Sequence, residues 1–210
     1  MGVLEKIQKI SGNTYSTDNL KSGLFAGVDE AGRGPLAGRV YAAAVILDHN
    51  HLPPGIKDSK KLTASARSVL FNEIKAQSVD WAIAYSSVEE IDEINILQAT
   101  LLAMKRAILQ LLVAPQHIFI DGTHNPDVNY PMTCLIKGDE KLDCISAASI
   151  LAKHARDEYM IDCDKKYPVY QFAKHKGYPT KEHIQALSKF GPCEFHRKTF
   201  KPVRNFLNTQ

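Results

Sequence analysis

The chain has 210 residues, of which 44% are hydrophobic and 23% charged, and its formal net charge is +3. This length and mixture suit one sizeable globular core, or a core with a small appendage, and exclude a disordered chain. Because no apolar run approaches the roughly 18 residues of a membrane span, and the N-terminus has neither a signal-peptide core nor a myristoylation pattern, we expect a cytoplasmic protein.

The chain opens with a polar stretch followed by a buried strand that ends in charge. Residues 1–22 lack a sustained period, which predicts a lead-in segment, and residues 24–28 are apolar enough for a buried strand. Asp29, Glu30 and the glycine-flanked Arg33 come next. Carboxylates at the end of a buried strand are costly unless a cation compensates them, and glycines let a backbone approach a ligand. A polar hairpin turn uses the same residue types and is the alternative.

A second strand, a helix and a third strand are predicted next. Residues 39–47 form a buried strand, antiparallel to the first because the loop between them is short. Residues 49–61 are predicted to be a loop, and Thr63 can cap a helix that runs to Gln77. Alternation over residues 80–88 predicts the third strand.

A long helix then leads into two short strands. Apolar residues recur every three to four positions over residues 91–112, which predicts an amphipathic helix stopped by Pro115. Residues 117–122 form a buried strand that ends in Asp121, and residues 133–136 form another. A strand that follows a helix is usually parallel to an earlier one, so the carboxyl ends of these strands can gather on one edge of a sheet.

The last third of the chain combines a small-residue helix with a basic tail. Residues 144–159 suit a helix packed closely on the sheet. Residues 165–204 carry ten Lys and Arg against two Asp and Glu, interleaved with aromatic rings, which is typical of a surface that follows phosphates and stacks bases. A solvated basic face is the alternative. The rings belong to Tyr167, Tyr170, Phe172, Tyr178, Phe195 and Phe200.

Four carboxylates lie where apolar strands end, namely Asp29, Glu30, Asp121 and Asp139. Oxygen ligands without His or Cys partners favour magnesium or manganese, and the four cysteines lack the C-x-x-C spacing of a zinc site. Neighbours on an extended strand point to opposite faces, so we expect Asp29 and Glu30 to share a site only if the strand ends between them. Each acid alone also has a structural explanation, since Asp121-Gly122 is a common turn. Together with the basic tail, the acids favour a metal-assisted phosphodiesterase acting on nucleic acid.

Six motifs in a fixed order carry a family resemblance. They are Asp29-Glu30-Ala31-Gly32-Arg33-Gly34-Pro35, Asp58-Ser59-Lys60-Lys61-Leu62-Thr63, Asp121-Gly122, Lys137-Gly138-Asp139, Ser146-Ala147-Ala148-Ser149-Ile150-Leu151-Ala152-Lys153 and His175-Lys176-Gly177-Tyr178. Over roughly residues 24–200 the chain thereby resembles the type 2 ribonucleases H, in particular ribonuclease HII. The sibling ribonuclease HIII has lysine in place of Arg33 and an added N-terminal domain, for which the leading residues are too few.

The resemblance implies an α/β RNase H-like fold, a mixed five-stranded sheet flanked by helices, with a small helical C-terminal extension. The expected catalytic domain covers residues 23–163, and residues 164–210 are a basic substrate-binding extension packed on it. The implied activity is endonucleolytic cleavage of RNA in RNA–DNA hybrids and at single ribonucleotides in duplex DNA, leaving 5′-phosphate and 3′-hydroxyl ends, by a two-metal mechanism with Mg²⁺ or Mn²⁺. The implied partners are these duplexes, with no membrane, and a monomer is expected.

The resemblance also assigns roles by position. The four acids would bind metal and act in catalysis, while Gly32-Arg33-Gly34 would read the 2′-hydroxyl largely through backbone atoms. Tyr178 would stack on the sugar next to the junction and help to sense that hydroxyl. Lys60 and Lys61 would contact phosphates, unless they are a solvated pair.

Two questions stay open at the level of sequence. His196-Arg197 match the tail motif of the family, and either contact with the DNA backbone or structural packing explains them. A non-catalytic module that binds hybrids is the alternative to an enzyme, and adding magnesium or manganese to the protein with a labelled hybrid distinguishes the two.

Overall fold

The fold is built on a five-stranded mixed sheet, seen here in a computed structural model that describes residues 23–48, 50–56 and 62–207. The strands are β1 (Phe25–Ala31), β2 (Val40–Leu47), β3 (Ser78–Ser86), β4 (His117–Asp121) and β5 (Met132–Leu135), in the order β3-β2-β1-β4-β5. β1 pairs antiparallel with β2 and parallel with β4, as predicted. β2 pairs antiparallel with β3, and β4 pairs parallel with β5. The expected mixed five-stranded sheet is confirmed.

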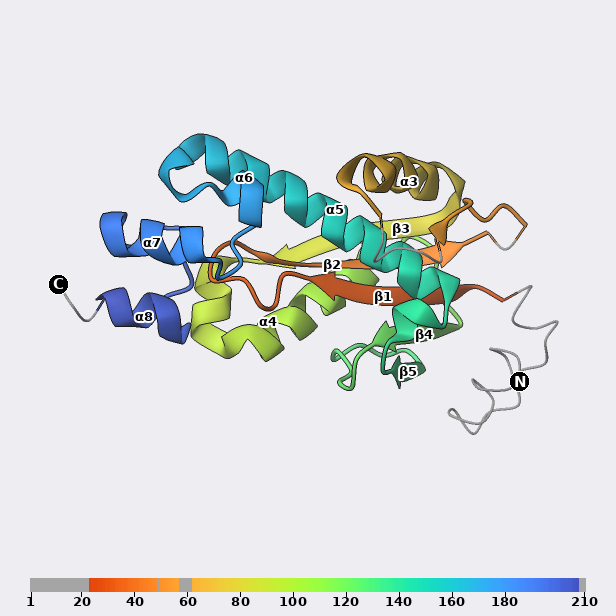
Figure 1. The fold of residues 1–210 in the computed structure, drawn as a ribbon. Coiled ribbons are helices and arrows are strands. Elements are labelled where there is room, and N and C mark those ends of the chain that lie inside the picture. Colours follow the sequence, from red (N-terminus) through yellow and green to blue (C-terminus); the bar gives the residue numbers. More distant parts are fainter. Residues whose placement is uncertain (1–22, 49, 57–61, 208–210) are drawn as a thin grey trace.

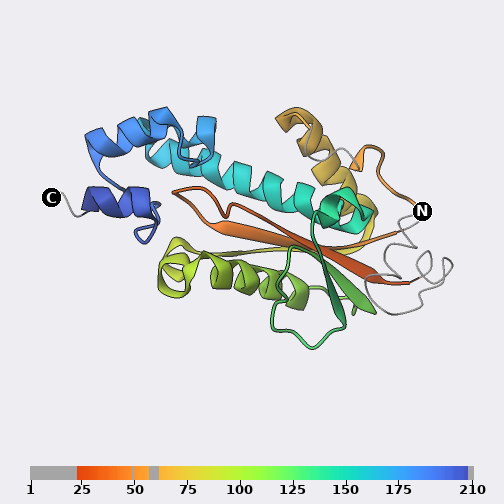
Figure 2. The same ribbon diagram turned by 60° about the horizontal axis from the view of Figure 1, so that its bottom comes forward.

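Helices cover both faces of the sheet (Figures 1 and 2). On one face lie α3 (Ala64–Gln77) and α5 (Asp143–Lys166), and on the other lies α4 (Val88–Leu109). Alternate residues of β1 face the two layers, because a strand points successive side chains to opposite sides. A Cβ built on Gly27 would lie 2.2 Å from the carbonyl carbon of Cys144, so the backbone of α5 packs directly on β1.

The short elements lie at the ends of this sandwich. They are η2 (Gly138–Glu140), η3 (Pro168–Tyr170), α6 (Phe172–His175), α7 (Lys181–Phe190) and α8 (Lys201–Leu207). The last four follow α5 and form the C-terminal end of the molecule (Figure 1). α5 continues to Lys166, past the expected end of its helix and past the predicted domain boundary at residue 163, so the division into two domains stays a prediction.

The long helix of the middle region differs from its predicted extent. It begins at Val88, where Ser87 forms a capping box with Glu90, and it ends at Leu109, well before Pro115. Asn95 interrupts it with a φ of 67°, and its side-chain oxygen accepts hydrogen bonds from the backbone N–H groups two and three residues later. An asparagine can cap a helix locally in this way, which the apolar spacing alone does not reveal. The predicted cap at Thr63 is confirmed.

Most aromatic rings of the basic tail do not form the stacking surface that was one of two interpretations of the sequence. Tyr170 and Phe172 are buried, and the other rings, apart from Tyr178, are only partly exposed. Most of them pack with Met160 and Cys163 of α5 in a small core of their own. The C-terminal helices are too short to bury much apolar area individually, so large rings supply their cohesion. Tyr178 is the exception, with 42% of its surface exposed.

Some predictions lie outside the described residues. These are the lead-in over residues 1–22 and the phosphate contacts Lys60 and Lys61. Within the described part of the chain, no helix has the length and apolar character needed to cross a membrane.

Candidate active site

Two of the predicted acids lie inside β1 rather than after it. The strand runs through Asp29 and Glu30 to Ala31, so the expectation that it must end between them is wrong. Asp29 is buried and hydrogen-bonded to Ser149 of α5, whereas Glu30 is only partly buried. The two carboxylates still interact. Burial raises the pKa of Asp29 well above its ordinary value, and the charges of Glu30 and Asp121 raise it further.

Asp121 joins these acids because β4 lies beside β1. Ile120 is paired with Val28 in the parallel register, which places the last residue of β4 next to Asp29. The Oδ1 atom of Asp121 accepts a hydrogen bond of 2.6 Å from the backbone N–H of Gly138. This bond holds η2, and with it the buried Asp139, against the end of β4. The structure therefore brings the four predicted acids to one edge of the sheet.

The electrostatics of this edge favour a cation. Burial raises the pKa of Glu30, an effect that Arg33 offsets in part and Asp121 increases. Two carboxyl groups with raised pKa values therefore lie near a third acid, and a bound divalent cation would relieve their repulsion. Oxygen donors of this kind fit Mg²⁺ or Mn²⁺. Within the ranges that the structure describes, no three His, Cys, Asp or Glu side chains already lie in metal-binding geometry.

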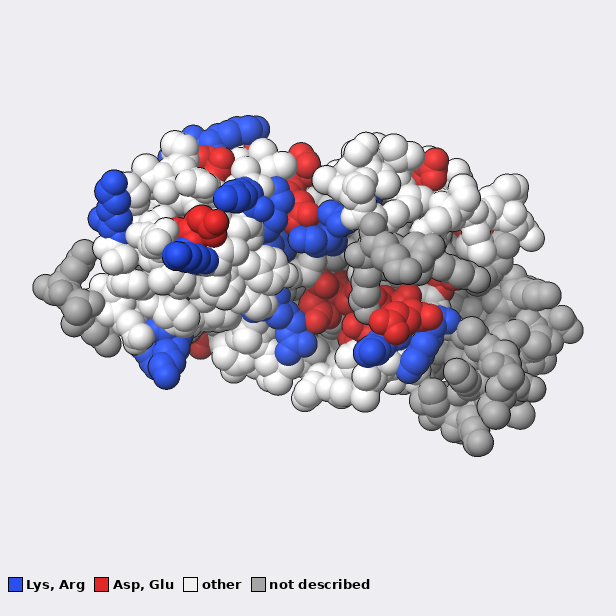
Figure 3. All heavy atoms as spheres, viewed as in Figure 1, with Lys and Arg blue, Asp and Glu red and all other residues white. Residues whose placement is uncertain are grey.

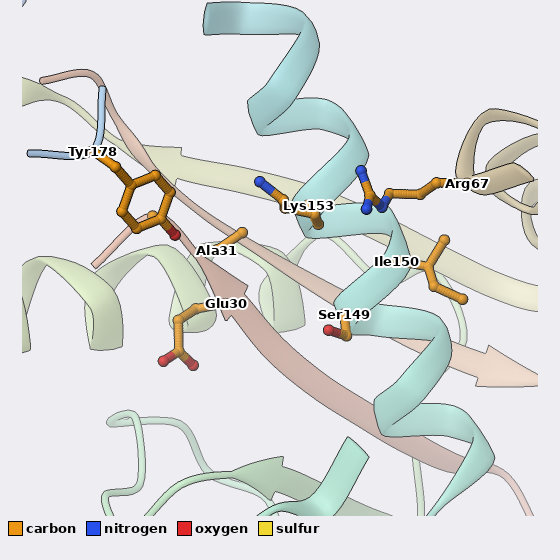
Figure 4. Close-up of a pocket in the computed structure, with 8 residues that line it drawn as sticks. Glu30, Ala31, Arg67, Ser149, Ile150, Lys153 and Tyr178 are labelled. Atoms are coloured by element: carbon orange, nitrogen blue, oxygen red, sulfur yellow. The ribbon is translucent and has the colours of Figure 1, made fainter. Parts of the chain in front are cut away.

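A cavity of about 280 Å³ opens beside the acids. Figure 4 shows Glu30 and Ala31 of β1 on one side, Ser149, Ile150 and Lys153 of α5 on another, and Tyr178 pointing its hydroxyl toward the strand. Gly32 and Arg67 complete the lining.

Two cations line this cavity together. Asp157 of α5 accepts a 2.6 Å contact from Lys153 Nζ on one oxygen and a 3.1 Å contact from Arg67 Nη1 on the other. Arg67 also donates to the carbonyl oxygen of Leu62. The mostly buried carboxylate of Asp157 thereby holds Lys153 and Arg67 in place at the wall of the cavity that Glu30 also lines. Such a pair is suited to contact a phosphate.

The predicted loop and Tyr178 face one another. A Cβ built on Gly34 would lie 3.6 Å from Cε1 of Tyr178, so the ring lies over the loop. Gly32 has a φ of 103°, and a Cβ there would lie 2.1 Å from Nε of Arg156, so a larger residue does not fit. The half-exposed Arg33 side chain donates a hydrogen bond of 3.3 Å to Oε1 of Glu30.

Three residues of the site had no predicted role. Ser149 and Lys153 stand in one of the quoted motifs, so their motif was a usable signal, although no function was assigned to them. Arg67 comes from α3, outside every motif, and only the approach of α3 to α5 brings it to the cavity.

The surface around the site carries both signs of charge. Figure 3 shows acidic side chains gathered near the middle of this face, with Lys and Arg on both sides of them. Acids that bind cations would thus be flanked by side chains that bind phosphates, an arrangement suited to a polyanionic substrate.

Comparison with known proteins finds one matching family model and several similar sequences and structures. Residues 26–203 match the family model described as Ribonuclease HII. The chain is 54% identical over 182 residues to Ribonuclease HII of Nitrosococcus oceani, covering 87% of this chain and 90% of the relative. Ribonuclease H2 from Pyrococcus horikoshii has a similar structure, with a TM-score of 0.74 and 27% identity over 88% of this chain and 97% of that one. Bst-RNase HIII, solved in complex with Mn²⁺, shares the fold with a TM-score of 0.71 and 19% identity, over 98% and 80% of the two chains.

Proposed function

This chain belongs to the ribonuclease HII family, with its RNase H-like fold, and we propose that it cuts the RNA strand of RNA–DNA hybrids and duplex DNA at single embedded ribonucleotides. The products would carry 5′-phosphate and 3′-hydroxyl ends. One observation carries the proposal: three electrostatically coupled acids lie beside a cavity whose other wall presents Tyr178.

We propose that Asp29, Glu30, Asp121 and Asp139 are the catalytic acids and hold two divalent cations, Mg²⁺ or Mn²⁺. Bound cations of this kind activate a water molecule and stabilise the leaving oxygen of a phosphodiester. The four side chains supply oxygen donors only, and the raised pKa values of Asp29 and Glu30 support a site at which a cation would stabilise their charged forms. The Mn²⁺ complex of Bst-RNase HIII supports a divalent cation in this fold.

We further propose that the ribose is recognised between the loop and Tyr178. The ring of Tyr178 lies over Gly34, and its exposed area is available to stack on a sugar. The backbone of Gly32, Arg33 and Gly34 would read the 2′-hydroxyl, the group that distinguishes RNA from DNA. Glycine at two of these positions lets the backbone itself come close to the nucleotide.

Phosphates of the substrate would contact the cation pair on Asp157. Lys153 and Arg67 are held by the same carboxylate, so both are oriented before the substrate arrives. A preoriented Arg binds phosphate through two N–H groups and Lys through a point charge. Lys60 and Lys61, which lie outside the described residues, remain proposed phosphate contacts.

The test is a cleavage assay on matched duplexes. Purified protein with Mg²⁺ or Mn²⁺ should cut an end-labelled duplex at one embedded ribonucleotide and leave the all-DNA duplex intact. A polymerase should extend the 3′-hydroxyl product directly. A protein that shifts the duplex in a gel but never cuts it with either metal would be a binding module, and the proposed activity would be rejected.

A further inference from the structure

His196 and Arg197 are completely buried, although they lie in the basic tail. Neither side chain can contact a DNA backbone, so of the two explanations open from the sequence only an internal role remains. Buried polar side chains are expensive unless their hydrogen-bonding groups are satisfied. The partners of these two residues therefore indicate what they do.

Arg197 binds the carbonyl groups of the loop that follows β1. Its Nη1 donates to the carbonyl oxygens of Arg33 at 3.0 Å and Pro35 at 2.7 Å, and its Nη2 donates to that of Gly32 at 2.6 Å. Its Nε donates to the carbonyl oxygen of Gly38 at 2.9 Å. One rigid guanidinium thus fixes the path of the whole loop.

His196 is linked to the segment of Tyr178 through a second histidine, His183. The backbone N–H of Cys193 donates to Nδ1 of His196, so Nε2 of that ring carries its proton. Nε2 of His196 lies 3.0 Å from Nε2 of His183, and Nδ1 of His183 lies 2.9 Å from the carbonyl oxygen of Tyr178. Since a carbonyl only accepts, Nδ1 of His183 donates to it and Nε2 accepts from His196. The result is a directed chain of hydrogen bonds from residue 193 to Tyr178.

Other contacts join the loop after β1 to the segment that carries Tyr178. The backbone N–H of Leu36 donates to the carbonyl oxygen of Gly177 at 2.8 Å, and that of Arg197 donates to the carbonyl oxygen of Leu36 at 2.9 Å. Arg156 of α5 donates through Nη2 to the carbonyl oxygens of Ala37 and Lys176. The loop and the Tyr178 segment are therefore held at a set separation.

We propose that His196 and Arg197 are positioning residues that fix the Tyr178 ring relative to the Gly32–Gly34 backbone, His196 through His183 and Arg197 directly. The proposal rests on the proposed function, since it concerns the recognition of the ribose. Neither residue touches the substrate. Their effect is on geometry, and a displacement of about 1 Å at a reacting group can lower a rate by about a hundredfold.

A pair of substitutions at His183 separates this role from simple packing. His183→Asn places an amide nitrogen near the position of Nδ1 and keeps the bond to the Tyr178 carbonyl, whereas His183→Gln keeps an acceptor for His196 and loses that bond. We expect kcat/KM on the single-ribonucleotide duplex to be about tenfold lower for His183→Gln than for His183→Asn, because the bond to the Tyr178 carbonyl holds the segment, whereas the bond from His196 serves to orient the imidazole that makes it. The melting temperatures of the two variants should be similar. His51→Gln, on an exposed histidine far from this network, is the control that should match the wild type.

The Tyr178→Ala background provides a readout that packing would not change. If His183 acts through the Tyr178 ring, His183→Gln should cause no further loss of activity once the ring is gone. Additive losses in the double variant, or equal activities of His183→Asn and His183→Gln, would overturn the inference.

Arg197→Lys tests the role that we propose for Arg197. Lysine keeps the charge but loses the planar guanidinium that donates to the carbonyl oxygens of the loop. In a variant that still folds, as judged by circular dichroism, kcat/KM on the single-ribonucleotide duplex should fall at least about tenfold. A folded variant with wild-type activity would remove Arg197 from the proposal. Absence of cleavage by the wild type would instead reject the proposed function, so the two failures are distinguishable.

Discussion

Two regions of this protein bury polar side chains in different ways: the acidic edge of the sheet and the C-terminal region. At the acidic edge, burial and neighbouring charge raise the pKa values of Asp29 and Glu30, so the folded protein holds charge that it does not compensate fully. In the C-terminal region, Arg197 and His183 have their hydrogen-bonding groups matched to carbonyls and to one another. The proposed divalent cation would complete the first region, whereas the second is complete as folded.

The two regions differ in the role that their electrostatics support: the acidic edge is suited to bind a cation, and the C-terminal network is suited to hold its neighbours in place. Uncompensated carboxylates weaken the fold when the site is empty and bind a cation strongly when it fills. A satisfied network of neutral histidines and one guanidinium holds its neighbours in a single arrangement. Substitutions in the two regions should therefore change stability in opposite directions.

Asp29→Asn should give the largest effect. Loss of one carboxylate ligand should lower kcat at least about a thousandfold, because a bound metal supplies several kcal/mol of stabilisation. A raised pKa in the folded state means that the charged form destabilises the fold above pH about 4. The variant should therefore melt a few °C higher than the wild type in EDTA at pH 7. Calorimetry with and without Mg²⁺ checks this, and a variant that cuts normally or melts lower would contradict it.

Tyr178→Ala tests the exposed residue that joins the two regions. Stacking of a ring on a nucleotide is worth about 1–3 kcal/mol, so cleavage at a single ribonucleotide should fall about ten- to a hundredfold. The fold should be unaffected because the side chain is well exposed. Tyr178→Phe, which keeps the ring, should lose less. Unchanged turnover of Tyr178→Ala would remove this residue from the site.

Lys153→Ala should weaken binding rather than chemistry. The substitution removes one cation of the pair on Asp157, so KM should rise about three- to tenfold and the dependence of log KM on log salt should be shallower by about one unit. The matched control is Lys105→Ala, which breaks a Lys–Asp pair on the opposite face of the sheet. Steady-state kinetics from low to high salt decide the outcome. An equal effect of both substitutions would argue against a phosphate contact.

Lower pH should destabilise the C-terminal network and reduce the cost of burying the acidic side chains. Burial lowers the pKa of His183 to about 4 and that of His196 to about 3. Their contribution is complete above pH about 6.5, where the unfolded histidines are neutral, and is lost as the pH falls toward 4. Asp29 and Glu30 act the other way: burial raises their pKa values, so protonation at lower pH removes the cost of holding their charge in the fold. The double variant His183→Asn/His196→Gln should therefore lose less stability than the wild type between pH 7 and 5.

Thermal denaturation at pH 7 and at pH 5 measures this difference. For the wild type we expect a fall in melting temperature of about 5 °C or more over the same interval. A double variant as acid-sensitive as the wild type would show that other groups control the loss.

Much of the fold and the identity of the candidate site residues could be predicted from sequence alone. Apolar alternation predicted the strands, and the motifs identified the four acids, the Gly32–Gly34 loop and Tyr178, because these features depend on residue type at nearby positions. It failed where a local side chain competes with the helix, as at Asn95, and where rings turn inward, as at Tyr170.

The assembly of the candidate site depends on contacts between distant segments that the sequence does not reveal. β1 continues through Asp29 and Glu30, and Asp121 reaches them because β4 pairs beside β1, which no property of the 29–30 dipeptide encodes. Arg67 reaches the cavity through the packing of α3 on α5. Arg197 meets the carbonyl of Gly32 across 165 positions of chain. The role of an arginine in a basic tail depends on whether the fold exposes it to DNA or buries it against backbone carbonyls, and the sequence pattern does not distinguish these two cases.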